Sequence, residues 1–280
     1  MRAILGVVLS AAVSVCLSAI PDRAHATMVF QDDFESGNLS KTQGGARWTN
    51  SARTRVNCGF ARDGACSLEF DFEGSASGDA MAEQRFTLAP AGVGYPELWI
   101  RYDLFVPANY YHRNIAPSNN KGFIYLWSGD SSAPDQGYGN PRPLLSDNWW
   151  AASNGQSEAS LHVRRPGSDQ HLYEFTQLAV TAADRGKWMR VLLHFKLASA
   201  TNNDGVAQYW KTPEGGARVQ ILNKTNGAWY ESGSPGFNNG YLLGYANAGF
   251  TQNTKLYIDN IIFSTTPIGP YPPGGVTVDR

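Results

Sequence analysis

The sequence predicts an all-β protein in which two antiparallel sheets pack face to face as a β-jelly roll. About a dozen segments alternate apolar and polar residues with a period of two, which is typical of strands with one buried face. The chain of 280 residues also contains 29 glycines, 15 prolines and 12% aromatic residues, which suits many short strands joined by tight turns. No segment shows helical periodicity of useful length, and no internal repeat is present. Many strands in one domain of this size favour a sandwich.

The stretch 97–127 predicts two strands joined by a polar, aromatic-rich loop. In the first strand, 97–106, the apolar residues from Leu98 to Val106 share one face, and the other face is mixed: Trp99, Arg101, Asp103 and Phe105. In the second strand, 122–127, one face is aromatic and the other aliphatic: Phe123, Tyr125 and Trp127 against Ile124 and Leu126. Together these faces would supply the Arg, Asp, Tyr and Trp side chains that a sugar-binding sheet needs.

Further strands are expected along the chain, at 67–73, 82–88, 157–165, 172–178, 187–197, 206–211, 218–223, 241–245 and 255–264. An Asn-Asp-Gly turn at 203–205 favours a hairpin between two of them. The segment 128–156 is rich in Gly, Pro, Ser, Asn and Asp, and we interpret it as a long loop that carries Trp149 and Trp150. Loops of that length in a compact domain are usually functional or disordered.

The first 26 residues have the pattern of a secretory signal peptide. One basic residue, Arg2, precedes an apolar run, and an Ala-x-Ala cleavage pattern follows at 24–26. A membrane anchor is the alternative, but the apolar run is short and is interrupted by serines. We therefore expect a signal peptide at 1–26, a β-jelly-roll domain at 27–265 and a Pro/Gly-rich tail at 266–280. The mature protein would be secreted or periplasmic, with no membrane span.

The charge balance argues against a nucleic-acid partner. The chain has 23 basic and 24 acidic side chains, and export would remove only Arg2, Arg23 and Asp22 of these. No global basic field remains to attract a phosphate backbone. A polyanionic ligand would need a local basic patch instead.

Two of the three cysteines, Cys58 and Cys66, remain after removal of the signal peptide. They flank a turn that contains Gly59 and Gly64, and in an exported protein such a pair is expected to form a disulfide across a hairpin. Two cysteines alone make a poor metal site. We assign the bridge no chemistry.

Short motifs in a characteristic order resemble those of a known family. In chain order they are Glu83 and Phe86 of a Glu-x-x-Phe strand, Val106-Pro107, Gly186-Lys187-Trp188, Leu243-Gly244-Tyr245 and the strand from Tyr257 to Asn260. Over most of the mature chain the sequence resembles concanavalin A-like jelly rolls, and within them the polysaccharide lyases of the heparin lyase I and alginate lyase type. Where these lyases usually carry Gln-x-His, this sequence has Tyr125-Leu126-Trp127. Either other residues transfer the proton, or the sheet only binds.

The resemblance implies β-elimination from a uronate. That reaction needs a group that neutralises the carboxylate, a base for the proton alpha to it and an acid for the leaving oxygen. Arg85 and Lys121 are the candidates for the carboxylate. His162 or His112, together with Tyr245, are the candidates for proton transfer.

Further residues are candidates for substrate binding because their strand positions place them on a polar or aromatic face: Arg101, Tyr125, Trp127, Arg164, His194, Lys196 and Tyr241. Clustered large aromatic side chains on an open face are uncommon without a ligand. A sandwich has two outer faces and only one binds ligand, so solvated surface is the alternative for each polar residue. Arg85 could likewise form a structural salt bridge with Glu83 or Asp103.

By the same resemblance, a structural Ca²⁺ ion would tie the first and last strands together through carboxylate and backbone oxygens. The expected ligands are Asp33, Glu35 and Asp259, with Asp32 nearby. The alternative is that Asp33 and Asp259 only cap strand ends.

Other functions find less support in the sequence. A paired-carboxylate glycosidase would need acidic residues on one strand face, and the only such alternation, Glu69, Asp71 and Glu73, is interpreted as a solvated face. No Ser-His-Asp elbow, phosphate loop or zinc motif is present. We therefore expect a lyase whose partner is an extracellular, acidic polysaccharide. The alternatives are a non-catalytic carbohydrate-binding jelly roll and a structural or adhesive surface protein.

Overall fold

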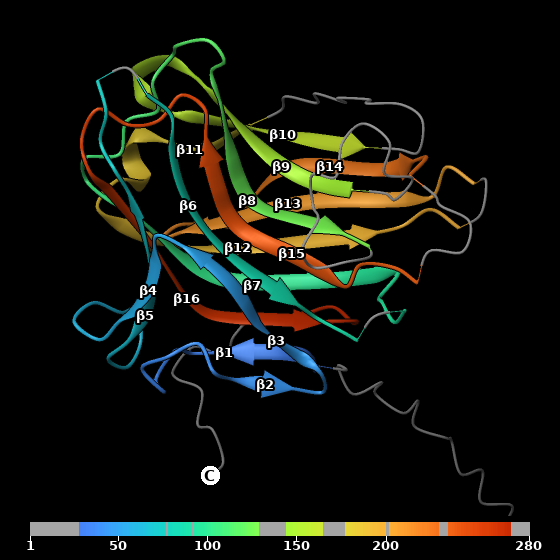
Figure 1. Ribbon diagram of the computed structural model, residues 1–280. Helices are drawn as coiled ribbons and strands as arrows, with labels where there is room; N and C mark the ends of the chain where they lie inside the picture. Colours follow the sequence, from blue (N-terminus) through green and yellow to red (C-terminus); the bar gives the residue numbers. More distant parts are fainter. Residues whose placement is uncertain are drawn as a thin grey trace, which may run out of the picture.

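The computed structural model describes residues 28–76, 78–90, 92–128, 144–164, 177–199, 202–229 and 235–269, and these form a β-sandwich (Figure 1). Two antiparallel sheets, each with eight strands in these ranges, lie one behind the other. Between the strands, the described residues contain two short 3₁₀ helices, η1 (Ser153–Gly155) and η2 (Ala182–Asp184), and no α-helix. The predicted all-β jelly roll is confirmed. No helix in these ranges is long and apolar enough to cross a membrane.

The first sheet has the strand order β14-β13-β12-β7-β16-β5-β4, and β1 also pairs with β16. In that order the strands are β14 (Val219–Gly227), β13 (Gly205–Pro213), β12 (Lys187–Lys196), β7 (Glu97–Val106), β16 (Thr254–Ser264), β5 (Ser67–Phe72), β4 (Thr54–Asn57) and, against β16, β1 (Met28–Asp32). We call the outer surface of this sheet, which carries Trp99, Arg101 and His194, the β7 face.

The second sheet has the order β11-β10-β9-β8-β15-β6-β3-β2. Its strands are β11 (Leu178–Val180), β10 (Ser157–Arg164), β9 (Leu144–Ala151), β8 (Asn119–Trp127), β15 (Asn239–Ala246), β6 (Ala80–Thr87), β3 (Ala46–Ala52) and β2 (Thr42–Gln43). We call its outer surface, which carries Lys121, Tyr125 and Trp127, the β8 face.

The core lies between the sheets and follows from the alternation in the sequence. The five inward residues of β7, from Leu98 to Val106, are all fully buried, as the sequence predicts. Burial of each such side chain contributes about 1.5–3 kcal/mol. The Tyr102 hydroxyl crosses the core and donates a hydrogen bond to the Phe123 carbonyl oxygen in the other sheet, at 2.9 Å. This contact links the two layers at the middle of the sandwich.

The two strands of the stretch 97–127 do not share a sheet, which corrects the prediction of one common polar face. β7 pairs with β12 and β16, whereas β8 pairs with β9 and β15. The segment 107–118 carries the chain from one sheet to the other. The outward residues Trp99 and Arg101 therefore lie on the opposite side of the molecule from Tyr125 and Trp127.

The predicted faces of the second strand are also corrected. The pairing of β8 with β9 is irregular between Lys121 and Tyr125. Phe123 consequently joins Ile124 and Leu126 in the core, and only Tyr125 and Trp127 remain together in a separate cluster outside it. A local irregularity shifts the phase of the alternation, which a strict period of two cannot represent.

The predicted loop 128–156 contains a strand. Leu144–Ala151 forms β9 between β8 and β10, while residues 129–143 lie outside the described part of the chain. Trp149 packs in the core, and Trp150 points the other way and donates from Nε1 to Ser160 Oγ at 3.0 Å. The abundance of polar residues concealed this strand, because its outward positions are polar as well.

The other predicted strands correspond to β5, β6, β10, β12, β13, β14, β15 and β16. The segment predicted at 172–178 falls almost wholly outside the described residues. The strands β1 to β4 were not predicted, because their apolar and polar residues alternate only weakly.

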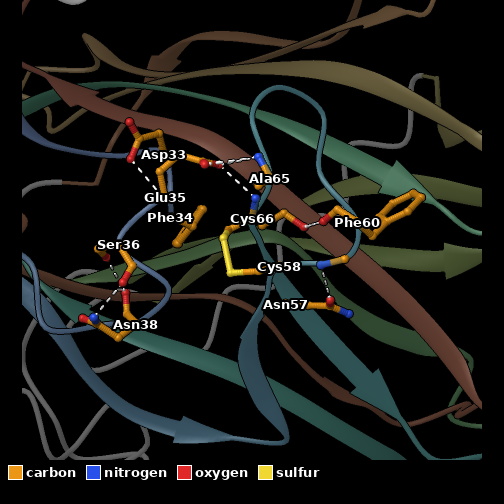
Figure 2. The surroundings of a disulfide bond; sticks show 12 residues. Asp33, Phe34, Glu35, Ser36, Asn38, Asn57, Cys58, Phe60, Ala65 and Cys66 are labelled. Carbon is orange, nitrogen blue, oxygen red and sulfur yellow. Dashed lines mark hydrogen bonds between the residues drawn. A yellow bond between two sulfur atoms is a disulfide. The ribbon is translucent and has the colours of Figure 1, made fainter.

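The predicted disulfide between Cys58 and Cys66 is confirmed (Figure 2). It closes the hairpin of β4 and β5, just beyond the Asn57–Ser67 pair. In Figure 2 the Glu35 side chain reaches the same hairpin, where its carboxylate accepts the Cys66 backbone N–H at 2.9 Å. The turn after β1 is thus fastened to the end of the first sheet.

Candidate functional site

A row of side chains in register crosses five strands of the β8 face. Its members, from β6 to β10, are Arg85, Tyr241, Tyr125, Ser146 and His162. Neighbouring strands lie about 4.8 Å apart, so the row extends over about 19 Å. His162, Tyr245 and Arg85 therefore belong to one sheet, a condition that the predicted site requires.

The centre of the row is a group of packed rings, which we call the aromatic cluster: Tyr125, Trp127 and Tyr241. Tyr125 and Tyr241 stack almost in parallel, with ring centroids 4.7 Å apart and planes inclined by 8°. Trp127 lies 6.0 Å from Tyr241 and 6.4 Å from Tyr125. Such ring pairs contribute about 0.5–1.5 kcal/mol beyond their buried area. All three are nearly fully buried, at 1–2% exposure, which corrects the prediction that these rings lie on an open face.

Cationic groups flank the aromatic cluster. The Lys121 ammonium lies 4.9 Å from the centroid of the Tyr125 ring, within the range of a cation–π interaction. On the other side, Arg85 forms an ion pair with Glu83, and Arg85 is the more exposed of the two side chains. The structural alternative for Arg85, a salt bridge with Glu83, is thus present. The pair holds the guanidinium in place on the outer face.

Tyr245 lies at the open end of the site. The pairing of Ala246 with Asn120 places Tyr245 directly across from Lys121, and its side chain is 38% exposed. Gly244 precedes it with a φ of +127°, a conformation that side chains with a Cβ rarely adopt. A Cβ there would lie 2.8 Å from a ring carbon of Tyr241 and would meet Lys121. Because Gly244 has no Cβ, Lys121 and Tyr241 can both lie close to its backbone.

His162 occupies the far end of the row. Its Nδ1 is 3.2 Å from Ser146 Oγ, and its ring centroid is 6.3 Å from that of Tyr125. Three strand spacings, about 14 Å, separate the strand of His162 from that of Tyr245. This distance is too long for both side chains to act on one glycosidic bond.

Strand β9 supplies two polar residues, Ser146 and Asn148, that sequence analysis did not include in the site. Ser146, Asn148 and Trp150 point to the β8 face, and Asn148 lies between Lys121 and Ser160 in register. The strand could have been recognised from the sequence because Leu145, Asp147 and Trp149 alternate with these outward residues.

Asp147 lies directly beneath the site, on the core side of β9. Its carboxylate accepts the Phe123 backbone N–H at 3.1 Å, and burial raises the pKa of Asp147 to about 7. Burial raises the pKa values of Tyr102 and Tyr209 well above their usual range, and the nearby Asp147 carboxylate raises them further. A titrating carboxyl group is thus built into the floor of the site.

Three predicted binding residues lie on the β7 face and not in this site. His194 contacts Glu97 at 2.7 Å and Gln208 at 2.9 Å, Lys196 pairs with Asp204 at 3.1 Å, and Arg101 donates to the Gly269 carbonyl oxygen at 3.2 Å. Both sheets and the core separate them from Tyr125, so one sugar cannot contact both groups. Arg101, His194 and Lys196 are therefore removed from the site, which is a correction.

His112 is fully buried and cannot contact a polymer. Its Nδ1 lies 2.9 Å from Ser157 Oγ, and its backbone N–H donates to the Gly155 carbonyl oxygen at 3.0 Å. Burial lowers the pKa of His112 to about 4, so the ring is neutral near pH 7. His112 anchors the segment 107–118. The predicted residue Arg164 ends β10, but its side chain lies outside the described part of the structure.

The predicted calcium ligands act as hydrogen-bond acceptors for backbone groups. Asp33 accepts from Glu35 N at 3.3 Å, and Asp259 accepts from Arg62 N at 2.8 Å. Glu35 accepts the Ala65 N–H at 3.0 Å. Across the described ranges, no three His, Cys, Asp or Glu side chains gather as a metal site. These contacts agree with the capping alternative, and calcium stays a prediction.

Comparison with known proteins identifies the fold. No protein-family model matches the chain, and no curated protein matches it. Among solved structures, it is similar to a variant of alginate lyase Aly36B in complex with alginate trisaccharide, with a TM-score of 0.59, 11% identity and coverage of 87% of this chain and 100% of that one. It is also similar to endo-β-1,4-glucuronan lyase from the fungus Trichoderma reesei, with a TM-score of 0.56, 18% identity and coverage of 86% and 96%. Alginate lyase vAL-1 from Chlorella virus gives a TM-score of 0.56, 12% identity and coverage of 86% and 100%. The chain therefore has the jelly-roll fold of these polysaccharide lyases.

Proposed function

We propose that this protein is a secreted polysaccharide lyase that cleaves an acidic, uronate-containing polysaccharide by β-elimination. The observation that carries the proposal is the arrangement on the β8 face. There, Arg85 and Lys121 flank a stack of tyrosines, and Tyr245 lies beside the lysine. Proteins of the same fold named as alginate and glucuronan lyases support this chemistry by analogy.

Arg85 would bind the carboxylate of a neighbouring uronate, and Lys121 would stabilise the carboxylate of the reacting one. As the alpha proton leaves, negative charge spreads onto this group, and cations that are already in place stabilise it most. The guanidinium of Arg85 offers two parallel N–H donors to a carboxylate, and its ion pair with Glu83 fixes its direction. Lys121 supplies a point charge on the other side of the aromatic cluster.

Tyr245 would carry the proton. It faces Lys121 in register and is the most exposed tyrosine of the site, and its phenolate form would act as the base. The phenolate takes the proton at C5, the C–H electrons form the C4=C5 double bond, and the C4–O glycosidic bond breaks. The new hydroxyl then gives its proton to the departing oxygen, so the tyrosine returns to its starting form. His162 is buried beside Tyr125 and held by Ser146, so it would support the aromatic cluster from below the substrate.

The experiment is incubation with a panel of uronate polysaccharides, among them alginate and glucuronan, with ultraviolet detection of unsaturated ends. We expect at least one polymer to give product. Lys121→Ala should lower the rate by about a hundredfold, while Lys196→Ala, its counterpart on the β7 face, should keep the wild-type rate. A soluble, folded protein that forms no product from any polymer would overturn the proposal.

A non-catalytic carbohydrate-binding protein is the second candidate. It is favoured by Tyr125 and Trp127, which stand where the resemblance implies a Gln-x-His motif. Retardation by a polysaccharide in affinity gels, without any unsaturated product, would support this candidate over the lyase.

A further inference from the structure

Two tryptophans on the β7 face form a surface that the proposed reaction does not use. Trp99 of β7 and Trp210 of β13 are both half-buried, and their ring planes are inclined by only 10°, with centroids 6.2 Å apart. Two strand spacings, about 9.6 Å, separate β7 from β13, so the indoles lean toward each other over β12. Neither ring is part of the hydrophobic core that the described residues form. We call these two residues the tryptophan pair.

A chain of hydrogen bonds across three strands braces the tryptophan pair. The buried His194 ring of β12 stacks on Trp99, with centroids 3.8 Å apart and planes inclined by 10°. Its Nδ1 is 2.9 Å from Gln208 Oε1, and its Nε2 is 2.7 Å from Glu97 Oε1. Gln208 in turn donates from Nε2 to Asn223 Oδ1 at 2.7 Å. Because both imidazole nitrogens are engaged, the His194 ring is fixed in direction and keeps Trp99 in place. A surface that is already ordered loses little conformational entropy when a ligand binds.

The charged groups beside the tryptophan pair occur in pairs. Glu97 contacts His194 at 2.7 Å, and Lys196 contacts Asp204 at 3.1 Å. Neither pair has an excess of positive charge, so these groups do not favour a carboxylated ligand over a neutral one. In this respect the surface differs from the β8 face, where Lys121 lies over an aromatic ring.

The combination of flat rings and a polar rim matches the two kinds of surface that a sugar presents. One face of a pyranose ring consists of C–H groups, which pack on the electron-rich face of an indole, and its hydroxyl groups lie around the edge. Glu97, Gln208 and Asn223 reach solvent at the rim, and their oxygen and nitrogen atoms suit hydroxyl groups. A flat apolar protein surface would instead bury these polar groups without partners, which costs free energy.

We propose that the tryptophan pair is a second, non-catalytic site that binds an uncharged pyranose chain by stacking. This site goes beyond the proposed function and does not depend on it, because it uses neither the aromatic cluster nor the cations of the β8 face. Both sheets lie between the two sites, so one short saccharide cannot occupy both. The tryptophan pair would hold the protein on a neutral glycan while the β8 face is free to bind an acidic polymer.

The test titrates the full protein with cellohexaose, a neutral saccharide, and follows the indole N–H signals by NMR. We expect the signals of Trp99 and Trp210 to shift, and Trp99→Phe and Trp210→Phe assign them by their loss. Trp210→Ala should weaken the binding seen at Trp99 by about tenfold, because it removes one of the two stacking rings. Trp150→Ala is the matched control, since it removes a tryptophan from the outer surface of the other sheet, and it should leave the Trp99 shift unchanged.

The wild-type titration decides the proposal even if Trp210→Ala does not fold. Folded wild-type protein in which neither indole shifts would overturn it, as would shifts confined to tryptophans of the β8 face. A glucuronan oligosaccharide that shifts the two indoles more strongly than cellohexaose would contradict an uncharged ligand.

A second arm measures retardation in gels that contain hydroxyethyl cellulose, together with sedimentation of the same proteins. Wild type and Trp150→Ala should be retarded, and Trp210→Ala should migrate freely. Equal retardation of all three proteins would count against the site. Self-association that Trp210→Ala abolishes, without any indole shift in wild type, would make the partner a second copy of this chain and would overturn the proposal.

The outcome can be separated from that of the proposed function. Trp210→Ala should leave the rate of β-elimination on short uronate oligosaccharides unchanged. Indole shifts with cellohexaose in a protein that cleaves no polymer would leave this site standing while the lyase proposal fails. Unsaturated product without any indole shift would do the reverse.

Discussion

The two outer faces of the sandwich arise from the same alternating pattern, but they differ in what their charged side chains contact. On the β7 face, Glu69 forms ion pairs with Arg55 and Lys255, and Asp103 forms one with Arg190. On the β8 face, Arg85 pairs with Glu83, and the Lys121 ammonium lies over the Tyr125 ring. Charges that pair with each other stabilise a surface only modestly. The cation held beside a stack of tyrosines is the difference on which we base the proposal that the β8 face meets the ligand.

The largest expected effect compares two tyrosines, one on each face. Tyr245→Phe removes the hydroxyl that carries the proton, so kcat/KM for the lyase reaction should fall by about a thousandfold, mostly in kcat. Tyr257→Phe removes a hydroxyl that donates to Glu69 on the β7 face, and activity should stay near wild type. Steady-state rates of unsaturated product formation measure both. Equal rates for the two variants would show that the Tyr245 hydroxyl does not transfer the proton.

The next effect concerns buried carboxyl groups and pH. The folded pKa of Asp147, about 7, lies above its ordinary value, so its contribution to stability is complete at low pH and is lost as pH rises from about 4 to 7. A shift of about three units corresponds to about 4 kcal/mol at neutral pH. Asp147→Asn should remove this fall in the free energy of unfolding between about pH 4 and 7. Urea unfolding of both proteins at several pH values measures it, and parallel stability curves would contradict the assignment.

Glu69 on the β7 face should show the opposite sign. Burial acts to raise its pKa, but hydrogen bonds from Asn57, Lys255 and Tyr257 outweigh burial, and the pKa is lowered. Its contribution is present above the ordinary glutamate pKa and is lost as pH falls below it. Glu69→Gln should therefore flatten the acid side of the stability curve, where Asp147→Asn has little effect.

A smaller effect is expected at the end of the first sheet. Replacing Cys58 and Cys66 together by serine should lower the free energy of unfolding by about 2 kcal/mol, since the bridge closes a short loop. Lyase activity of the folded fraction should not change, because the hairpin of β4 and β5 belongs to the first sheet and the proposed site to the second. Thermal unfolding and activity on the same samples check this. A parallel loss of activity would mean that the hairpin supports the site.

The smallest effect compares two histidines. His162→Ala should raise KM by about tenfold with kcat little changed, because this residue supports the Tyr125 ring and does not transfer the proton. His194→Ala should leave both constants unchanged, since His194 is packed against Trp99 on the other face, with ring centroids 3.8 Å apart. A large fall in kcat for His162→Ala would return this histidine to the proton-transfer step.

The sequence by itself determined the all-β class, most strand positions and the disulfide. Each depends on neighbours along the chain: a period of two within 97–106, or two cysteines across one hairpin turn. It also named Arg85, Lys121, Tyr241 and Tyr245 as candidates, and the structure places all four on strands of one sheet.

Only the tertiary structure decided which outward faces coincide. Alternation tells which residues of one strand share a side, but it does not tell which sheet the strand joins. β7 and β8 follow each other closely in the chain and yet join different sheets, so Arg101 and Tyr125 point away from each other. The row from Arg85 to His162 depends on pairings between strands as distant in sequence as β6 and β15. Such long-range pairing is fixed by the packing of the whole core, and it decides which charges meet at the site.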